Sequence, residues 1–167
     1  VDFSYEVSRS LAAVEGVVLL VDATKGIQAQ TLANLDLVRS QNLVVIPAVN
    51  KIDMDAADTE KTVEELAVLL GIDKKGILKI SSKQGTNVEN ILSEVISKVP
   101  SPKINMEAPF RALIFDSVYD SYKGVIAYVR VIDGKIKNGA KIRLLAAKAK
   151  SEAREIGYFK PQLVKQE

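Results

Sequence analysis

The chain has 167 residues, of which 47% are apolar and 26% are charged, and its formal net charge is +2. It contains neither cysteine nor histidine, which excludes disulfides, thiol nucleophiles, zinc sites of the usual ligand type and any histidine acid or base within these residues. The length allows one ordinary domain or two small ones. No apolar run approaches the roughly 18 residues that a membrane span needs. These features predict a soluble, intracellular globular protein without a strong overall attraction to nucleic acid.

Patterns typical of helices and strands alternate over residues 1–100. A stripe of Phe3, Val7, Leu11 and Val14 predicts a first helix that ends near Gly16. A second helix is expected to end near Ser40, and a third to extend from the N-cap Asp58 to Gly71. A fourth is expected after the N-cap Asn87. Short apolar runs predict strands at 17–21, 43–49 and 77–81. We expect the first to be buried on both faces, and Pro47 is the one residue that argues against a central position for the second. This order predicts an α/β domain with a largely parallel sheet.

The pattern changes at residues 101–109, a proline-containing stretch that we interpret as a linker between domains. Beyond it the apolar period becomes two, as in residues 124–133, and Asp133-Gly134 and Asn138-Gly139 are turn signals. Residues 110–167 therefore predict a small antiparallel β-domain. Because no closing element follows and sheet edges would stay unpaired, we expect this domain to be incomplete.

The most informative residues are Asn50, Lys51, Ile52 and Asp53, which directly follow a predicted strand. Ligands of open α/β sheets bind beyond the carboxyl ends of strands. An aspartate there can accept two hydrogen bonds from the N1–H and the N2 amine of guanine, whereas adenine presents an acceptor in place of the N1–H. Mismatched polar partners of this kind discriminate by about 10⁴-fold in favourable sites. Asn50 would hold the loop and reach the imidazole side of the base, and the Lys51 stem would cover the ring and ribose.

A second group, Ser81, Ser82 and Lys83, follows the next predicted strand. The backbone N–H of Ser82 could donate to guanine O6, and Lys83 could pack near the base. The alternative is an ordinary polar loop in which Asp53 or Asp55 caps a helix. The occurrence of both groups at successive strand ends favours a guanine site over that alternative.

Two further features allow a structural interpretation beside a functional one. Asp22 ends a predicted strand, but without neighbouring carboxylates we interpret it as a structural loop acid rather than a metal ligand. The last third of the chain is locally basic, and these residues either meet RNA phosphates or form an ordinary charged sheet edge; they are Lys135, Lys137, Lys141, Arg143, Lys148 and Lys150.

The chain resembles the LepA-type translational GTPases, a family of ribosome-associated elongation factors. The resemblance covers essentially all 167 residues. It rests on residues 1–13 (VDFSYEVSRSLAA), 19–23 (LLVDA), 26–31 (GIQAQT), 111–117 (RALIFDS) and 122–125 (YKGV). It implies that residues 1–100 are the C-terminal portion of a GTP-binding domain. Residues 110–167 would then begin a β-barrel second domain.

The resemblance implies that Asn50, Lys51, Ile52 and Asp53 bind the guanine of GTP or GDP, together with Ser81, Ser82 and Lys83. Ser82 replaces the usual central alanine, which should matter little because that contact uses a backbone N–H. The implied activity is GTP hydrolysis to GDP and phosphate on the ribosome, with ribosomal RNA and proteins as partners and tRNA as a further candidate. The implied compartment is the cytoplasm; a peripheral membrane association and a mitochondrial homologue stay open, and nothing in the sequence indicates a homo-oligomer.

Motifs for phosphate chemistry are not found in these 167 residues: no G-x-x-x-x-G-K-[ST] loop, switch threonine or Asp-x-x-Gly-His. By resemblance they precede Val1, so we expect the catalytic residues and the Mg²⁺ ligands upstream and predict that the isolated chain is a fragment that does not hydrolyse GTP. The alternatives are another translational GTPase, of the elongation factor G or BipA-like type, or a ribosome-binding module that has lost catalysis.

Overall fold

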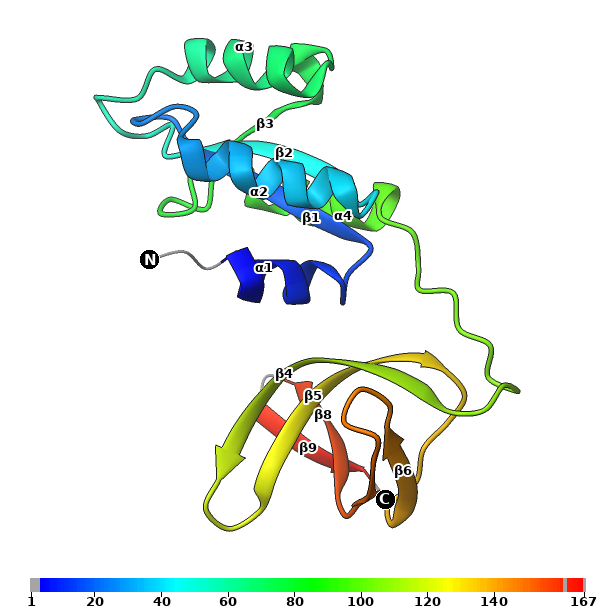
Figure 1. Cartoon of the computed structure of the whole chain (residues 1–167). Coiled ribbons are helices and arrows are strands. Elements are labelled where there is room, and N and C mark those ends of the chain that lie inside the picture. Colours follow the sequence, from blue (N-terminus) through cyan, green and yellow to red (C-terminus); the bar gives the residue numbers. More distant parts are fainter. Residues whose placement is uncertain (1–3, 161, 167) are drawn as a thin grey trace. The chain divides into compact units, whose positions relative to one another are not determined.

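The computed structural model describes residues 4–160 and 162–166, which form a parallel three-stranded sheet with helices and three two-stranded sheets (Figure 1). The predicted class, an α/β part followed by antiparallel β structure, is confirmed. The small sheets pair β4 with β5, β6 with β7 and β8 with β9, and no closed barrel forms among the described residues. No helix in that part of the chain is both long enough and apolar enough to cross a membrane.

The parallel sheet has the order β1-β2-β3, with β1 at Gly16–Asp22, β2 at Val44–Asn50 and β3 at Leu78–Lys79. The third strand is therefore shorter than the predicted 77–81. Strands β1 and β2 pair in register from Gly16 with Val44 to Asp22 with Asn50. The carboxyl ends of both strands therefore lie at the same edge of the sheet.

Pro47 lies in the central strand β2, although a proline, which has no N–H, is not expected in a central strand. Backbone groups of β2 point alternately to its two neighbours: the Asn50 carbonyl accepts from Ala23 after β1, and the Val49 carbonyl accepts from Ile80 after β3. By this alternation the backbone nitrogen and carbonyl of Pro47 point to the β3 side. Pairing with β3 begins only at Ala48, so no ladder bond is lost.

Four helices accompany this sheet: α1 at Ser4–Leu11, α2 at Ala29–Ser40, α3 at Thr59–Leu70 and α4 at Val88–Lys98, with a 3₁₀ turn at Lys74–Gly76. Phe3 of the predicted first helix lies outside the described residues. The predicted limits of α3 are confirmed, because the Asp58 carboxylate accepts the Lys61 N–H at 3.2 Å and Gly71 ends the helix with a φ of 68°.

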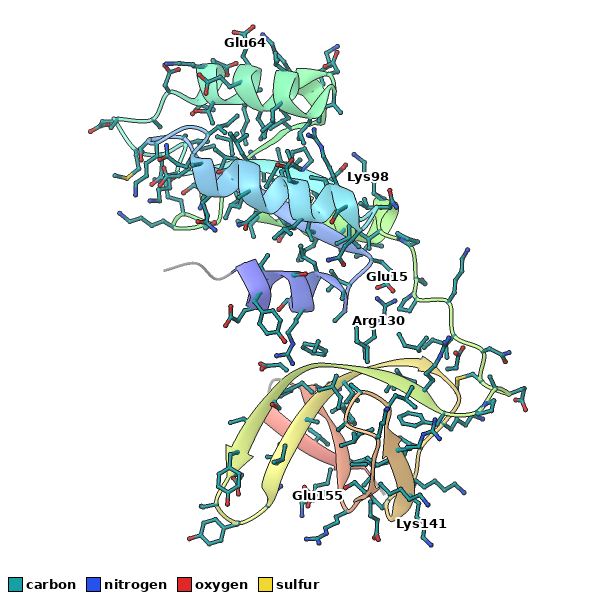
Figure 2. All side chains as sticks on the ribbon, in the orientation of Figure 1. Glu15, Glu64, Lys98, Arg130, Lys141 and Glu155 are labelled. Carbon is teal, nitrogen blue, oxygen red and sulfur yellow. The ribbon has the colours of Figure 1, made fainter. Side chains whose placement is uncertain are left out.

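The core forms where α2 and α3 pack on one face of the sheet. Leu35 of α2, Val63 and Leu66 of α3, and Val49 of β2 are each at most 1% exposed and belong to one cluster. On the opposite side of α3, Glu64 points away from the sheet (Figure 2) and pairs with Lys74 at 2.6 Å. The helix therefore has the apolar and polar faces that its sequence period predicts.

Two predictions about buried or capping side chains are wrong. Strand β1 buries Leu19 and Val21 but leaves Val18 and Leu20 40% and 49% exposed. Alternate residues of a strand face opposite sides, and on the side of Val18 and Leu20 the described residues cover β2, where Ile46 and Ala48 are at most 1% exposed, but leave β1 open. Asn87 precedes α4 as predicted but makes no capping bond. It has a φ of 58°, and its amide donates to the Lys79 carbonyl at 2.9 Å.

The described antiparallel part consists of two ten-residue strands and four five-residue strands. These are β4 at Arg111–Asp120, β5 at Gly124–Asp133, β6 at Ala140–Leu144, β7 at Ala149–Ala153, β8 at Ile156–Lys160 and β9 at Gln162–Gln166. Gly134 and Gly139 have φ values of 69° and 75°, as expected of the two predicted turns. The Arg111 guanidinium donates twice to Asp133 Oδ2, at 3.0 and 2.7 Å, and so ties β4 to β5.

The contacts divide the chain into two compact units, residues 1–102 with 114–129 and residues 103–113 with 130–167. Residues 101–109 contain no helix or strand, apart from a single bridge between Asn105 and Asp133. The domain boundaries proposed from the sequence stay a prediction.

Candidate guanine-binding site

A hollow of about 320 Å³ lies beyond the carboxyl ends of β2 and β3. Its lining comes from the two loops that the sequence singled out, and consists of Asn50, Lys51, Asp53, Met54, Ser82 and Lys83. Five of the seven predicted site residues therefore line one hollow. The other two, Ile52 and Ser81, do not: Ile52 packs against the core cluster, and Ser81 is fully buried. Met54 is a lining residue that the sequence reasoning missed.

Asn50 joins the two loops through its side-chain oxygen. Asn50 Oδ1 accepts the backbone N–H of Ser82 at 3.0 Å and the Ser82 hydroxyl at 3.1 Å. The predicted role of Asn50 in holding the loop agrees with this geometry. The Ser82 N–H, expected to donate to a base carbonyl, donates to Asn50 here, so a ligand oxygen would have to share or replace that hydrogen bond.

Asp53 is supported from behind by Ser81. The Ser81 hydroxyl accepts the Gln84 N–H at 3.1 Å, which leaves its own hydrogen free to donate. A hydrogen bond from Ser81 is the main reason that the pKa of Asp53 lies below its usual value, and the positive charge of Lys83 lowers the pKa further. Asp53 is therefore an ionised acceptor at neutral pH, at the rim of the hollow.

Lys51 adopts a φ of 66°, which is uncommon for a residue with a side chain. Its ammonium lies 2.6 Å from Asp22 Oδ2, while Asp22 Oδ1 accepts the N–H and the hydroxyl of Thr24 at 2.9 and 2.7 Å. These bonds, that of Lys51 first, lower the pKa of Asp22 to about 2. Asp22 thus ends β1 and fixes the turn that follows it, as expected of a structural acid, but the residue that it pairs with, Lys51, is a predicted site residue.

The sequence reasoning did not connect Asp22 with Lys51. A signal was available, because two adjacent parallel strands end at Asp22 and Asn50, and residues that follow such ends are neighbours in space. Metal binding finds no support in the described ranges 4–160 and 162–166, since they hold no group of three histidine, cysteine or acidic side chains that could ligate an ion.

A family model described as the elongation factor Tu GTP-binding domain matches residues 1–101. Among curated proteins, elongation factor 4 of Streptomyces avermitilis is 55% identical over 163 residues, and elongation factor 4 of Thermobifida fusca is 51% identical over 165 residues. The matches cover 98% and 99% of this chain but 26% and 27% of those proteins. The chain therefore spans about a quarter of the length of these relatives.

Solved structures agree on the fold. The chain superposes on a bacterial selenocysteine-specific elongation factor with a TM-score of 0.73, and on the elongation factor SelB of Methanococcus maripaludis in complex with the GTP analogue GppNHp with a TM-score of 0.74. Both are 22% identical in sequence, and the matches cover 96% and 95% of this chain but 28% and 36% of those chains. The chain belongs to the elongation factor Tu GTP-binding domain family, and its resemblance to the LepA-type translational GTPases is confirmed by its elongation factor 4 relatives.

Proposed function

We propose that the hollow lined by Asn50, Lys51, Asp53, Ser82 and Lys83 binds the guanine base of GTP or GDP, as part of a longer ribosome-dependent GTPase related to elongation factor 4. The observation that carries this proposal is the ionised carboxylate of Asp53 at the rim of a hollow between two strand-end loops. The family model, which describes a GTP-binding domain, supports the nucleotide class.

Base selectivity would depend on the hydrogen-bonding character of Asp53. An ionised carboxylate only accepts hydrogen bonds, and guanine offers two adjacent donors, the N1–H and the N2 amine. Adenine offers an acceptor at N1, which would leave the carboxylate facing a lone pair. A buried mismatch of this kind is costly because neither group finds a replacement partner.

The remaining lining residues would fix the orientation of the base. Asn50 and Ser82 are hydrogen-bonded to each other, so the two loops present one surface rather than two mobile ones. A base carbonyl near Ser82 would compete for the N–H that Asn50 Oδ1 now accepts. Lys51 and Lys83, on opposite loops, would cover the base with their methylene stems.

Hydrolysis is proposed for the longer protein and not for these 167 residues alone. When GTP is bound, the group that reacts is its γ-phosphate, and catalysis depends on positioning and charge around the phosphates and Mg²⁺. The phosphate-loop and switch motifs that such catalysis uses are not found in these 167 residues. We therefore predict that the isolated chain binds GTP weakly and does not hydrolyse it.

Contact with the ribosome is proposed for the part of the chain that holds strands β4 to β9, called the β region below. The basic residues noted in the sequence are all exposed on or between β5 to β7, and Lys141 projects from β6 into solvent (Figure 2). Exposed lysine and arginine side chains of this kind bind RNA phosphates without sequence preference. The relatives named elongation factor 4 support a role in translation.

The base assignment is tested with Asp53→Asn in the full-length protein that carries this chain. An amide in place of the carboxylate would donate to the C2 oxygen of xanthine and lose its match with guanine. We expect GTP affinity to fall by about 10² to 10⁴-fold and xanthosine triphosphate to become the preferred nucleotide, measured by calorimetric titration.

Asp55→Asn is the matched control, because it makes the same chemical change two residues away and Asp55 does not line the hollow. This variant should keep the preference for GTP. An unchanged ratio of GTP to xanthosine triphosphate affinity in Asp53→Asn would contradict the proposed role of Asp53.

A further inference from the structure

Asp22 is an acidic side chain outside the proposed guanine site that forms an ion pair with a residue of that site. It ends β1, whereas Lys51 follows the end of β2, and the two strands are in register there. The Lys51 ammonium lies 2.6 Å from Asp22 Oδ2. Asp22 itself is absent from the residues that line the hollow, so any effect of Asp22 on a ligand would pass through Lys51.

The two carboxylate oxygens of Asp22 have separate partners. Oδ1 accepts from the N–H and the hydroxyl of Thr24, which fixes the loop after β1. Oδ2 faces Lys51. Because the Thr24 bonds already orient the carboxylate, the oxygen that meets Lys51 is held in place before the ammonium arrives.

Lys51 also has an unusual backbone. Its φ of 66° lies in the left-handed region that residues with a Cβ rarely adopt, and its carbonyl accepts the Met54 N–H at 3.1 Å. Backbone conformations of this kind persist where the surroundings over-determine them, and they are concentrated at binding sites. Lys51 is thus held at its backbone by the turn and at its ammonium by Asp22.

We propose that Asp22 is a positioning residue of the nucleotide site, which holds the ammonium of Lys51 so that the Lys51 side chain stays along the hollow in the absence of a ligand. This inference rests on the proposed function. A lysine stem has many rotamers, and a site that orders it beforehand does not lose that freedom when the base binds.

The size of the effect follows from the exposure of the pair. The side chains of Lys51 and Asp22 are 49% and 23% exposed, so water and salt screen their attraction. We expect Asp22→Asn to weaken GDP binding by about threefold to fivefold, without changing the preference for guanine that is assigned to Asp53.

The experiment compares Asp22→Asn, Lys51→Met and the double variant in the full-length protein, by calorimetric titration with GDP. Asparagine keeps an oxygen for Thr24 but places an amide NH₂ where the second oxygen met Lys51, so both the charge and the acceptor that face Lys51 are lost. If Asp22 acts through Lys51, the double variant binds GDP as Lys51→Met does, because the second change removes nothing further. The difference between the unsubstituted protein and Asp22→Asn should also shrink as the salt concentration rises from about 0.1 M to about 1 M.

Thr24→Ala provides the control for a purely structural role. It removes the hydroxyl bond to Asp22 but keeps the backbone N–H bond that also orients the carboxylate, and it keeps the ion pair. It should therefore bind GDP within about twofold of the unsubstituted protein. Equal losses in Thr24→Ala and Asp22→Asn, or independent losses that multiply in the double variant, would overturn the positioning role.

The same titrations separate this inference from the proposed function. If the unsubstituted full-length protein does not bind GDP, the proposed function fails and the role of Asp22 fails with it. If the unsubstituted protein binds GDP and Asp22→Asn binds it equally well, only the role of Asp22 is wrong.

Discussion

The α/β region, from α1 to α4, and the β region, from β4 to β9, differ in how they bury apolar side chains. Every hydrophobic residue that the structure buries lies between Leu11 and Ile80, within the parallel sheet and its helices. Among the described residues from Lys103 onward, no hydrophobic side chain is buried to that degree, although the strands there are longer than β3. Both regions have the apolar pattern that their elements require, so pattern alone does not explain the difference.

The difference follows from the architecture of the two regions. In the α/β region the central strand β2 has a neighbour on each side and helices pack on the sheet, so side chains between Leu11 and Ile80 become enclosed. A two-stranded sheet has no central strand, and a lone hairpin is marginal in water. The pair of Phe115 and Tyr128, with ring centroids 6.4 Å apart, packs one side of the β4–β5 hairpin without enclosing it. We therefore expect most of the stability to reside in the α/β region.

The largest predicted effect is that of Leu66→Ala in α3. Leu66 is fully buried, and replacing such a residue by alanine removes its contacts and leaves a cavity that costs about 2–5 kcal/mol of unfolding free energy. Urea unfolding followed by helical circular dichroism measures this, because the four α-helices of the described residues all lie in the α/β region.

Leu92→Ala is the control for that prediction. It makes the same substitution on α4, at a side chain that is 61% exposed. It should cost at most about 0.5 kcal/mol. Fluorescence of Tyr158, with the other four tyrosines replaced by phenylalanine, follows the second compact unit, because the chain has no tryptophan and Tyr158 is the tyrosine that lies in residues 130–167. A tyrosine transition that shifts as far as the helical one in Leu66→Ala would contradict separate stabilities.

A smaller effect is expected from Gly134→Ala, which tests whether the β region has a tight packing point of its own. A Cβ at Gly134 would meet the Ala108 carbonyl at 2.5 Å and the Phe110 nitrogen at 2.7 Å, and the φ is 69°. Since backbone must move, we expect a loss of about 2–3 kcal/mol in the tyrosine-detected transition.

Gly124→Ala distinguishes the clash from the backbone strain. Gly124 has a φ of 80° but open space around the position of a Cβ, so only the strain of about 1 kcal/mol applies. Equal losses in the two variants would mean that residues 108–110 yield readily and that the β region is loosely packed throughout.

The smallest predicted effects concern two carboxylate pKa values and the stability that depends on them at acidic pH. The pKa of Asp22 is lowered from 3.8 to about 2, chiefly by Lys51, and the pKa of Asp120 is lowered chiefly by the N–H groups of Lys123 and Tyr122. A carboxylate with a lowered pKa contributes stability that is present above about pH 4 and is lost as the pH falls through its folded-state pKa, which for Asp22 is near 2. Titration by nuclear magnetic resonance should show both shifts.

Salt distinguishes the two carboxylates. The main partner of Asp22 is an ammonium, so added salt should move its pKa back toward 3.8. The main partners of Asp120 are neutral backbone groups, and its pKa should respond less. The opposite order would mean that the ion pair of Asp22 does not persist in solution.

Most of the α/β elements could be predicted because their signals are local. The N-cap Asp58, the stop at Gly71 and the helical periods each involve neighbours along the chain. Asn87 shows the limit of this reasoning: its residue type favours a cap, but the carbonyl of Lys79, eight residues away, takes its side chain. Propensity therefore placed the start of α4 correctly and gave the wrong partner for the residue before it.

Pattern and spacing along the chain were enough to place Asn50, Asp53 and Ser82 at or just beyond neighbouring strand ends, because parallel strands bring their carboxyl ends to one edge. Tertiary structure decided which of these side chains line the hollow, that Ser81 supports Asp53 from the core, and that Lys51 pairs with Asp22. It also decided that Val18 and Leu20 stay exposed. The physical reason is the same in each case: strand register and the cover on each sheet face depend on residues distant in sequence, which local patterns do not specify.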